Sequence, residues 1–365
     1  MTRRAKVWTW SAIGFVVFAA VLGTVIEHYT RRFLFGSEGQ MGWRPDPVGT
    51  RAFLDELEQP TFRQAGAEVL KAARGVDAYL YRYADKVHRQ EYGTPYGPWN
   101  QGDAGTCVSF GWAMGSYVGQ CVDHCQGGLA DRPLRVDTSS LYGGSRTEGR
   151  LPPVAFAGYS DGSYGAAAAR WVSGLKNGHG GILYCKKYGD VDLTEYSIPR
   201  SRDWGARGVP PALAKIANEH TARQVALCGD WSSLTAALEN GLCVPVCSNI
   251  GFKGQDRDAD GFVRRNGSWA HCMVAIAVKY AKNNGPGSPN PMANPRDGVL
   301  IMNSWGPNWI RGGKHPEDQP DGSFWITRQD AEAILAQGDS FVIGSVEGFQ
   351  PRELVNDGWM AKEGR

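Results

Sequence analysis

The stretch Gln101-Gly-Asp-Ala-Gly-Thr-Cys107-Val-Ser-Phe-Gly-Trp-Ala113 decides which fold this chain is expected to adopt. It places a glutamine shortly before a cysteine, and the cysteine begins a segment with helical periodicity. A cysteine attacks an acyl carbon as the thiolate, which the positive end of a helix and a nearby imidazolium both favour. Thr106 is a plausible N-cap, so we expect Cys107 in the first turn of a helix, where a nucleophile would be activated.

Three glycines interrupt this predicted helix. Gly111, Gly115 and Gly119 each disfavour helix by about 1 kcal/mol relative to alanine. Close packing of the helix against other backbone would explain them.

A histidine and an asparagine far downstream complete the set that thiol catalysis requires. His271 precedes an apolar run that predicts a buried strand, and Asn303 follows another such run, residues 298–302. The side-chain carbonyl of Asn303 could accept one ring N–H of His271 and fix its tautomer. Taken singly, a buried cysteine is most often a small hydrophobe. The joint pattern indicates a base and the group that orients it.

In this order, Gln101, Cys107, His271 and Asn303 resemble the catalytic residues of the papain family of cysteine peptidases. The resemblance covers roughly residues 80–346. It implies an α+β, papain-like two-lobed fold, with a helical lobe that carries Cys107 and a β-barrel-like lobe that carries His271 and Asn303. In that fold Gln101 would donate to the oxyanion, and Trp305 would shield the His271–Asn303 hydrogen bond from water.

The resemblance also implies a substrate-binding set. Asp161-Gly-Ser-Tyr-Gly165 is similar to the family's glycine pair, which hydrogen-bonds the substrate backbone and begins the pocket for the second residue before the cleaved bond. Gly162 and Ser163 would take those positions, with Tyr164 as a pocket wall. Trp269 and Cys272, which flank His271, would line the same pocket.

The chain departs from the family pattern near the nucleophile. Ala104 and Val108 stand where the family signature has a first cysteine and an aromatic residue. His271 lies farther from Cys107 than the roughly 130–150 positions usual in the family. A Pro/Gly/Asn-rich stretch, residues 282–295, predicts a loop between the last two catalytic residues. These differences indicate a distant member whose substrate preference does not carry over.

The sequence divides into five parts. Residues 1–6 form a basic N-terminus, and residues 7–26 contain no charge and are long enough to cross a bilayer as a helix. A cleaved signal peptide is the alternative to this predicted transmembrane anchor. Residues 27–79 are expected to be a juxtamembrane stalk or short pro-segment, residues 80–346 the peptidase domain and residues 347–365 a tail.

The distribution of basic residues predicts on which side of the membrane the globular domain lies. The basic residues before the anchor slightly favour a catalytic domain on the extracytoplasmic side of a single-pass protein.

In the following part, residues 50–57 and 65–73 have helical periodicity. Further on, residues 104–175 are expected to be mostly helical, and residues 241–279 and 298–346 mostly strands.

Composition bears on partners and cofactors. The net charge is +2, with 39 basic and 37 acidic residues, which gives no reason to expect nucleic acid. The partners expected are a peptide or protein substrate and the membrane, and we expect no cofactor and no metal. Two weaker patterns remain open, a calcium loop and a metal or disulfide site. Their residues are Asp256, Asp258 and Asp260 for the first, and Cys121, His124, Cys125 and Cys185 for the second.

Three functions fit these observations. Peptide-bond hydrolysis by a Cys107 thiolate is the leading one. A catalytically inactive papain-type fold, used for binding or structure, is the second, and the altered surroundings of Cys107 leave it open. The third is an acyl-transferring enzyme, similar to a transpeptidase or transglutaminase, which would use the same acyl-thioester chemistry.

Overall fold

The structure is a computed structural model that describes residues 41–148, 161–174, 178–252, 256–281, 296–345 and 347–354. All of them belong to one compact unit that begins at Gly39. The predicted transmembrane anchor, residues 7–26, and the predicted loop at 282–295 lie outside the described residues. Within the described residues, no helix is both long and apolar enough to cross a bilayer.

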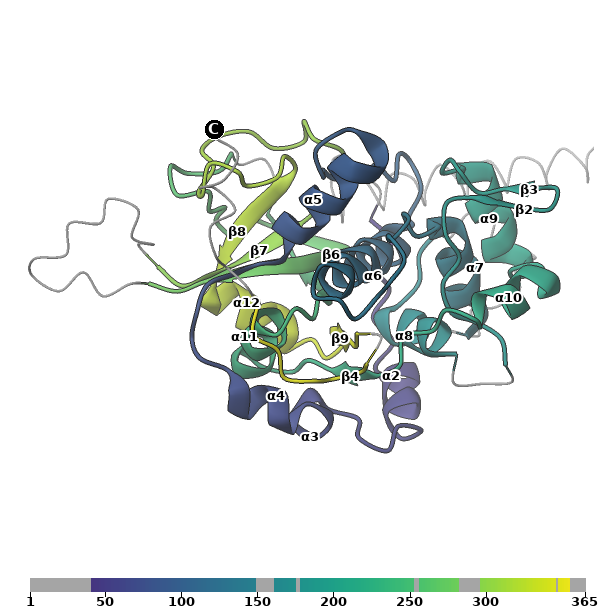
Figure 1. The fold of residues 1–365 in the computed structure, drawn as a ribbon, viewed down its shortest axis with the longest axis horizontal. Coiled ribbons are helices and arrows are strands. Elements are labelled where there is room, and N and C mark those ends of the chain that lie inside the picture. The colour runs from purple at the N-terminus through teal and green to yellow at the C-terminus, as the bar shows by residue number, and fades with distance from the viewer. Residues whose placement is uncertain are drawn as a thin grey trace, which may run out of the picture. The chain divides into compact units, whose positions relative to one another are not determined.

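The chain contains both helices and strands (Figure 1). The helices are α2 (Pro47–Leu54), α3 (Phe62–Ala65), α4 (Ala67–Ala72), α5 (Leu80–Tyr92), α6 (Cys107–Cys125), α7 (Thr138–Glu148), α8 (Gly165–Ser173), α9 (Ile198–Arg207), α10 (Pro211–Ala217), α11 (Trp231–Glu239) and α12 (Arg328–Leu335). The strands are β1 (Ala78–Tyr79), β2 (Lys187–Tyr188), β3 (Val191–Asp192), β4 (Val225–Leu227), β5 (Val244–Ile250), β6 (Ser268–Lys279), β7 (Gly298–Met302), β8 (Ser323–Thr327) and β9 (Phe341–Ile343).

The main sheet is built around β6, its longest strand. β6 pairs antiparallel with β5 along its first half, with β1 near its end and with β7, which in turn pairs with β8. Irregular register in both long pairings bends the sheet. The predicted strands at His271 and before Asn303 are confirmed as β6 and β7.

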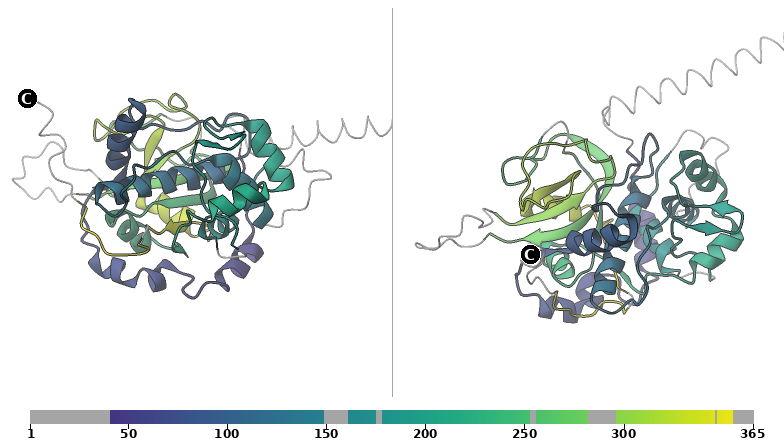
Figure 2. Two further views of the ribbon diagram at one scale, coloured as in Figure 1. Left: turned by 45° about the vertical axis from the view of Figure 1, so that its right-hand side comes forward. Right: turned by 45° about the horizontal axis from the view of Figure 1, so that its top comes forward.

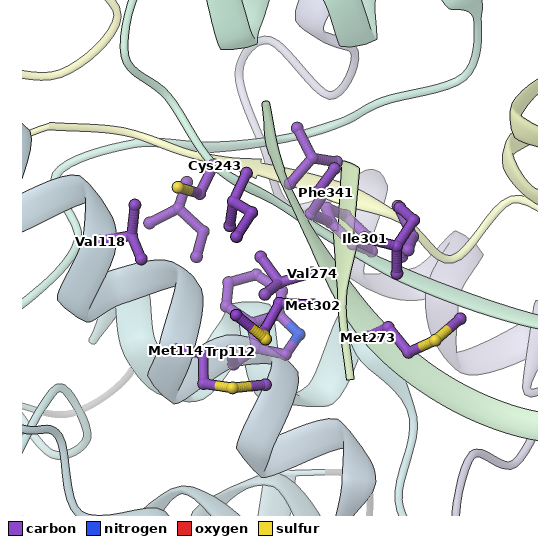
Figure 3. Packing of buried hydrophobic residues seen from close by; sticks show 14 of the residues in the cluster. Trp112, Met114, Val118, Cys243, Met273, Val274, Ile301, Met302 and Phe341 are labelled. Atoms are coloured by element: carbon purple, nitrogen blue, oxygen red, sulfur yellow. The ribbon is translucent and has the colours of Figure 1, made fainter. Parts of the chain in front are cut away.

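Helix α6 packs against this sheet, as Figure 3 shows. Trp112 and Met114 of α6 approach Val274 of β6 and Met302 of β7, and all four belong to one buried cluster. Because α6 begins at Cys107, this packing fixes the start of the helix relative to β6, which carries His271, and β7, which precedes Asn303.

Two of the three α6 glycines are explained by this contact. A Cβ on Gly111 would lie 2.9 Å from the sulfur of Cys272 and 3.0 Å from a backbone oxygen of β6. A Cβ on Gly115 would lie 3.1 Å from Val274, whereas a Cβ on Gly119 would meet no atom within 4 Å. The predicted close packing against other backbone is therefore confirmed at Gly111. At Gly115 the close neighbours are side chains, and at Gly119 the prediction is wrong.

Helices α7, α9 and α10, with the β2–β3 hairpin, gather on the side of α6 away from the sheet (Figures 1 and 2). They enclose a second small buried cluster that includes Trp204 and Leu213. The molecule thus has the mixed helix and sheet composition expected, with a half-barrel sheet. The expectation of mostly strands over 298–346 is wrong. The short strands β7, β8 and β9 alternate there with a long loop and with α12, whose N-cap Thr327 accepts a hydrogen bond from Asp330 N.

The described end of the predicted stalk packs on the domain. Helix α2 contacts α8, and α4 contacts α11. Phe53, Phe62 and Val69 are each at most 1% exposed. Residues 41–79 therefore contribute to the core of the domain. The disulfide considered among Cys121, Cys125 and Cys185 is not formed, since all eight cysteines, which the structure describes, are free.

Candidate active site

Cys107 occupies the first turn of α6, as predicted. Thr106 is in the N-cap position but makes no side-chain capping bond. Its hydroxyl instead shares a 3.1 Å hydrogen bond with the hydroxyl of Tyr196, and its carbonyl accepts one from Ser109. The helix therefore begins where the sequence predicted, although the residue at the cap is held by tertiary contacts.

The sulfur of Cys107 is surrounded by backbone N–H groups. The backbone N–H groups of Cys272, Gly42 and Val108 act on the sulfur to lower its pKa, and the residue is fully buried. These donors favour a thiolate, but burial outweighs them and raises the pKa of the Cys107 thiol to about 12. In this state the nucleophile is protonated.

His271 and Asn303 are joined by a short hydrogen bond. His271 Nε2 lies 2.7 Å from Asn303 Oδ1, and the same oxygen accepts the backbone N–H of Ser304 at 2.7 Å. Because Oδ1 is an acceptor, Nε2 carries the proton and Nδ1 is the basic nitrogen. Among the described residues Nδ1 has no hydrogen-bond partner. Burial lowers the pKa of His271 to about 4, so the ring is neutral.

Aromatic rings cover this pair. The centroid of the Trp305 ring lies 4.7 Å from that of His271, and the Trp269 ring lies 5.3 Å from His271 and 5.1 Å from Trp305. His271 and Asn303 are both fully buried. The geometry agrees with the expected shielding of the hydrogen bond by Trp305, and it adds Trp269 to the cover.

Gln101 docks onto the segment that follows Asn303. Its backbone N–H donates to Ser304 O at 2.9 Å, and its Oε1 accepts from Ser304 Oγ at 2.6 Å. Its Nε2 donates to Ala104 O at 2.8 Å. The side chain is therefore fixed beside the start of α6 with its amide nitrogen toward the loop that precedes Cys107.

An N-terminal segment lies across the site. Residues 41–44, here called the strap, run between the loop that begins α8 and strand β6. Ser163 N donates to Gly42 O at 2.9 Å, and Arg44 N donates to Ser163 O at 2.9 Å. On the other side, Trp43 N donates to Ala270 O at 3.1 Å. Ala270 directly precedes His271.

Gly42 is the tightest point of the strap. A Cβ on Gly42 would lie 1.9 Å from Gly105 O, and a Cβ on Gly162 would lie 2.5 Å from Gly42 O. Gly162 also has φ +119°, a conformation that favours glycine. The strap is thus held between two glycine backbones and directly over Cys107.

Of the predicted substrate-binding residues, Gly162 and Ser163 contact the strap. Tyr164 follows them as the N-cap residue of α8. Trp269 lies in the aromatic cover, and Cys272 points toward Gly111 of α6. Their roles toward a substrate stay predictions, as do those of Gln101, Cys107, His271, Asn303 and Trp305.

Three residues in the same region were not anticipated. Gly42 and Trp43 lie in the part expected to be a stalk or pro-segment. Asp339 is 3% exposed and accepts a 2.7 Å hydrogen bond from Trp43 Nε1. A glycine followed by a tryptophan in an otherwise polar stretch was the one signal that could have indicated a buried contact there.

A shallow groove lies beside Gln101. Its volume is about 460 Å³, and it is lined by Asn100, Gly102, Tyr196, Ser197, Ile198 and Pro199. The strap contributes no residue to its lining.

The aspartates of the calcium pattern have other partners. Asp258 caps its own turn by accepting from Asp260 N and Phe262 N and is paired with Arg296, while Asp256 accepts from Arg311 N. In the described part of the chain, no group of three or more His, Cys, Asp or Glu side chains is arranged to hold a metal ion.

The sequence matches no protein-family model and no curated protein. Solved structures do match the fold. Xylellain, a cysteine protease from Xylella fastidiosa, is 15% identical with a TM-score of 0.50, over 85% of this chain and 97% of that chain. The proCathepsin B S9 of Trypanosoma congolense is 13% identical with a TM-score of 0.48, over 84% and 86%. The similarity to xylellain establishes a papain-like fold, as the resemblance in sequence implied.

Proposed function

We propose that this chain is a thiol peptidase in which Cys107 attacks the peptide carbonyl and His271 moves the proton. The observation that carries the proposal is the 2.7 Å bond between His271 Nε2 and Asn303 Oδ1, formed next to the N–H of Cys272 that contacts the Cys107 sulfur. This geometry supports the proposal, because Cys107, His271 and Asn303 are the residue types that acyl transfer to a thiol requires.

The roles follow from the geometry. Asn303 keeps the proton on Nε2, so that Nδ1 accepts the proton of the Cys107 thiol and later gives it to the leaving amine. The backbone N–H of Cys107 and the amide of Gln101 would stabilise the tetrahedral oxyanion. Water then attacks the thioester carbonyl, with His271 as base, and releases the second product.

The strap supports a latent state for this site. Ser163, which the resemblance assigns to the substrate backbone, is bonded to Gly42 and Arg44 instead. Gly42 presents an N–H to the Cys107 sulfur, so the nucleophile faces a hydrogen-bond donor where a cleavable peptide would offer its carbonyl carbon. We therefore propose that residues 41–44 act as a pro-segment that must leave before a substrate enters.

The same proposal accounts for the charge states. Burial is the largest cause of both the raised pKa of Cys107 and the lowered pKa of His271. When the strap leaves and water enters, this cause weakens for both groups. The thiolate of Cys107 and the imidazolium of His271 then cost less free energy to form, as the chemistry requires.

Hydrolysis of a protein substrate tests the proposal. The full chain carrying Gly42→Ala, whose methyl group weakens the seating of the strap, is incubated with an unfolded protein, and products are identified by mass spectrometry. We expect new termini from hydrolysis, and we expect Cys107→Ser or His271→Ala in the same background to abolish them. Products joined to an added amine would indicate acyl transfer instead. Unchanged cleavage with Cys107→Ser would reject the thiol mechanism.

The location is proposed from sequence alone. Residues 7–26 would anchor the peptidase in a membrane, with the domain on the extracytoplasmic side. Fractionation in alkaline carbonate tests this: an anchored chain stays with the membranes, and a soluble one is released.

A further inference from the structure

Two buried thiols face each other across the pairing of β5 with β6. Cys247 of β5 is the cross-strand partner of Cys272 of β6. Directly paired residues of an antiparallel sheet project their side chains from the same face, so the two thiols lie on one side of the sheet. Both residues are 0% exposed, and both cysteines are free. The pair is therefore a dithiol inside the core.

Backbone hydrogen bonds show which kind of cross-strand pair it is. Cys247 N donates to Ser340 Oγ at 3.3 Å and so points away from β6. On β6, Ala270 O accepts from Trp43 N of the strap, and backbone groups two residues apart along a strand point the same way. The backbone of Cys272 therefore points away from β5. The two cysteines form a non-hydrogen-bonded pair, in which side chains approach each other most closely.

The geometry of such a pair allows a disulfide. Opposed residues of a non-hydrogen-bonded pair have Cα atoms about 4.5 Å apart. Disulfides span Cα separations of about 4.4–6.8 Å, so Cys247 and Cys272 can be joined with little movement of either strand. The electrostatics agree with this proximity, because burial raises the pKa of the Cys247 thiol and the neighbouring Cys272 thiol raises it further.

The dithiol adjoins the catalytic residues, but the peptidase mechanism uses neither of its sulfurs. Cys272 directly follows His271, and a Cβ on Gly111 of α6 would lie 2.9 Å from the Cys272 sulfur. The strap is bonded to Ala270, two residues before Cys272. A reagent that enters when the strap loosens therefore meets Cys272 before Cys247.

We propose that Cys247 and Cys272 are a redox-active modification site, at which a low-molecular-weight disulfide converts the two thiols into a cross-strand disulfide. The Cys272 thiolate attacks one sulfur of the reagent, whose S–S bond breaks, and the leaving thiolate takes up the proton that Cys272 lost. Cys247 then attacks the Cys272 sulfur of this mixed disulfide and displaces the second thiol. The protein gives up two electrons and two protons, and the small disulfide is reduced to two thiols.

The test uses the full chain, native and with Gly42→Ala, incubated with 2-hydroxyethyl disulfide, a small neutral reagent. Remaining thiols are blocked with N-ethylmaleimide, the unreduced chain is digested, and cross-linked peptides are identified by mass spectrometry. We expect a peptide pair joined through Cys247 and Cys272, at least tenfold more abundant than any other cross-link and released by dithiothreitol. Absence of this cross-link from both proteins overturns the proposal, as does a dominant disulfide between Cys272 and Cys107.

Cys247→Ala and Cys228→Ala are the matched variants, because each replaces a fully buried thiol. In Cys247→Ala, the reaction should stop at the mixed disulfide on Cys272. In Cys228→Ala, the cross-link should form as in the native chain, because Cys228 follows β4 and is not paired with β6. Melting temperatures check that both variants fold. Loss of the cross-link from a folded Cys228→Ala chain would overturn a site made of Cys247 and Cys272 alone.

Cys107→Ser separates this site from the proposed peptidase. We expect the Cys247–Cys272 cross-link to form at a comparable rate in this variant, because neither step uses the nucleophile. Failure of the peptidase proposal leaves that result unaffected. A cross-link that forms only when Cys107 is present would mean that the reagent reacts first at the nucleophile, and would overturn direct reaction at Cys272.

Discussion

At the residue scale, the site is defined by what burial does to two side chains. Cys107 and His271 are both fully buried, and burial shifts their pKa values in the directions that keep each neutral. Asn303 fixes the His271 tautomer through a bond that does not depend on charge. The His271 ring is therefore already oriented by Asn303, while Cys107 and His271 are both in the neutral form.

The lowered pKa of His271 has a consequence for stability. It is about 4 in the folded chain and about 6.5 when unfolded. The folded state then binds fewer protons between these values, so the His271 contribution is complete above pH 6.5 and is lost as pH falls toward 4, by up to roughly 3 kcal/mol. Urea unfolding of the native chain and His271→Gln at several pH values measures it.

The native chain and His271→Gln both contain Asp339. Its raised pKa makes the free energy of unfolding change with pH in the opposite direction, and this contribution cancels when the two proteins are compared. We expect the stability advantage of the native chain over His271→Gln to shrink as the pH is lowered from 7.5 to 4. An advantage that stays constant over this range would mean that His271 titrates normally in the folded state.

Gln101 provides a second prediction. In the Gly42→Ala background, Gln101→Ala should lower kcat by about 10²–10³-fold with a small change in KM if the amide stabilises the oxyanion. Steady-state kinetics with one peptide measures both constants. Gln101 also holds Ser304, so a loss confined to thermal stability, with kcat intact, would assign it a purely structural role.

The elements that hold Cys107, His271 and Asn303 could be predicted from sequence, because each residue lies beside a local pattern. His271 and Asn303 were placed by the apolar runs beside them, and Cys107 by helical periodicity. Asp339 could not be found this way. Its partners are Trp43, far away in sequence, and the first turn of α8, and no local pattern encodes such a contact.

At the element scale, α6 and β6 determine the position of the nucleophile. The helix approaches the strand closely enough that a Cβ on Gly111 would meet the Cys272 sulfur at 2.9 Å. Sequence periodicity predicted both elements, but it did not predict α12, which lies in a stretch expected to be strands. A short amphipathic helix between two strands is easily missed, because its few buried positions also fit a strand.

The α6 glycines give a matched pair of stability predictions. Gly119→Ala meets no atom and should stabilise the chain by about 0.5–1 kcal/mol, because alanine favours helix. Gly111→Ala should destabilise it by about 1–3 kcal/mol, because its methyl group would overlap Cys272 and the β6 backbone. Denaturant unfolding of the two variants should shift the midpoint in opposite directions. A gain in stability for Gly111→Ala would contradict the packing of α6 on β6.

At the scale of the whole molecule, the N-terminal part is built into the domain. The strap crosses the site, α2 packs on α8, and α4 packs on α11. The two-part arrangement of helices and sheet was predictable, since it follows from the order of helical and strand segments. The position of residues 41–44 was not, because a segment without regular structure acquires its place from the surfaces it bridges.

The central claim is that a catalytically competent thiol site is covered by the strap, and the alkylation rate of Cys107 in the full chain tests it most directly. Gly42→Ala places a methyl group 1.9 Å from Gly105 O, whereas Gly97→Ala, the matched control, meets no atom within 4 Å. A strain of about 1–3 kcal/mol predicts about 5- to 150-fold faster labelling by an epoxide thiol probe at neutral pH in Gly42→Ala, with Gly97→Ala unchanged. Labelling that is equally slow in all three proteins, or that misses Cys107, would contradict the claim.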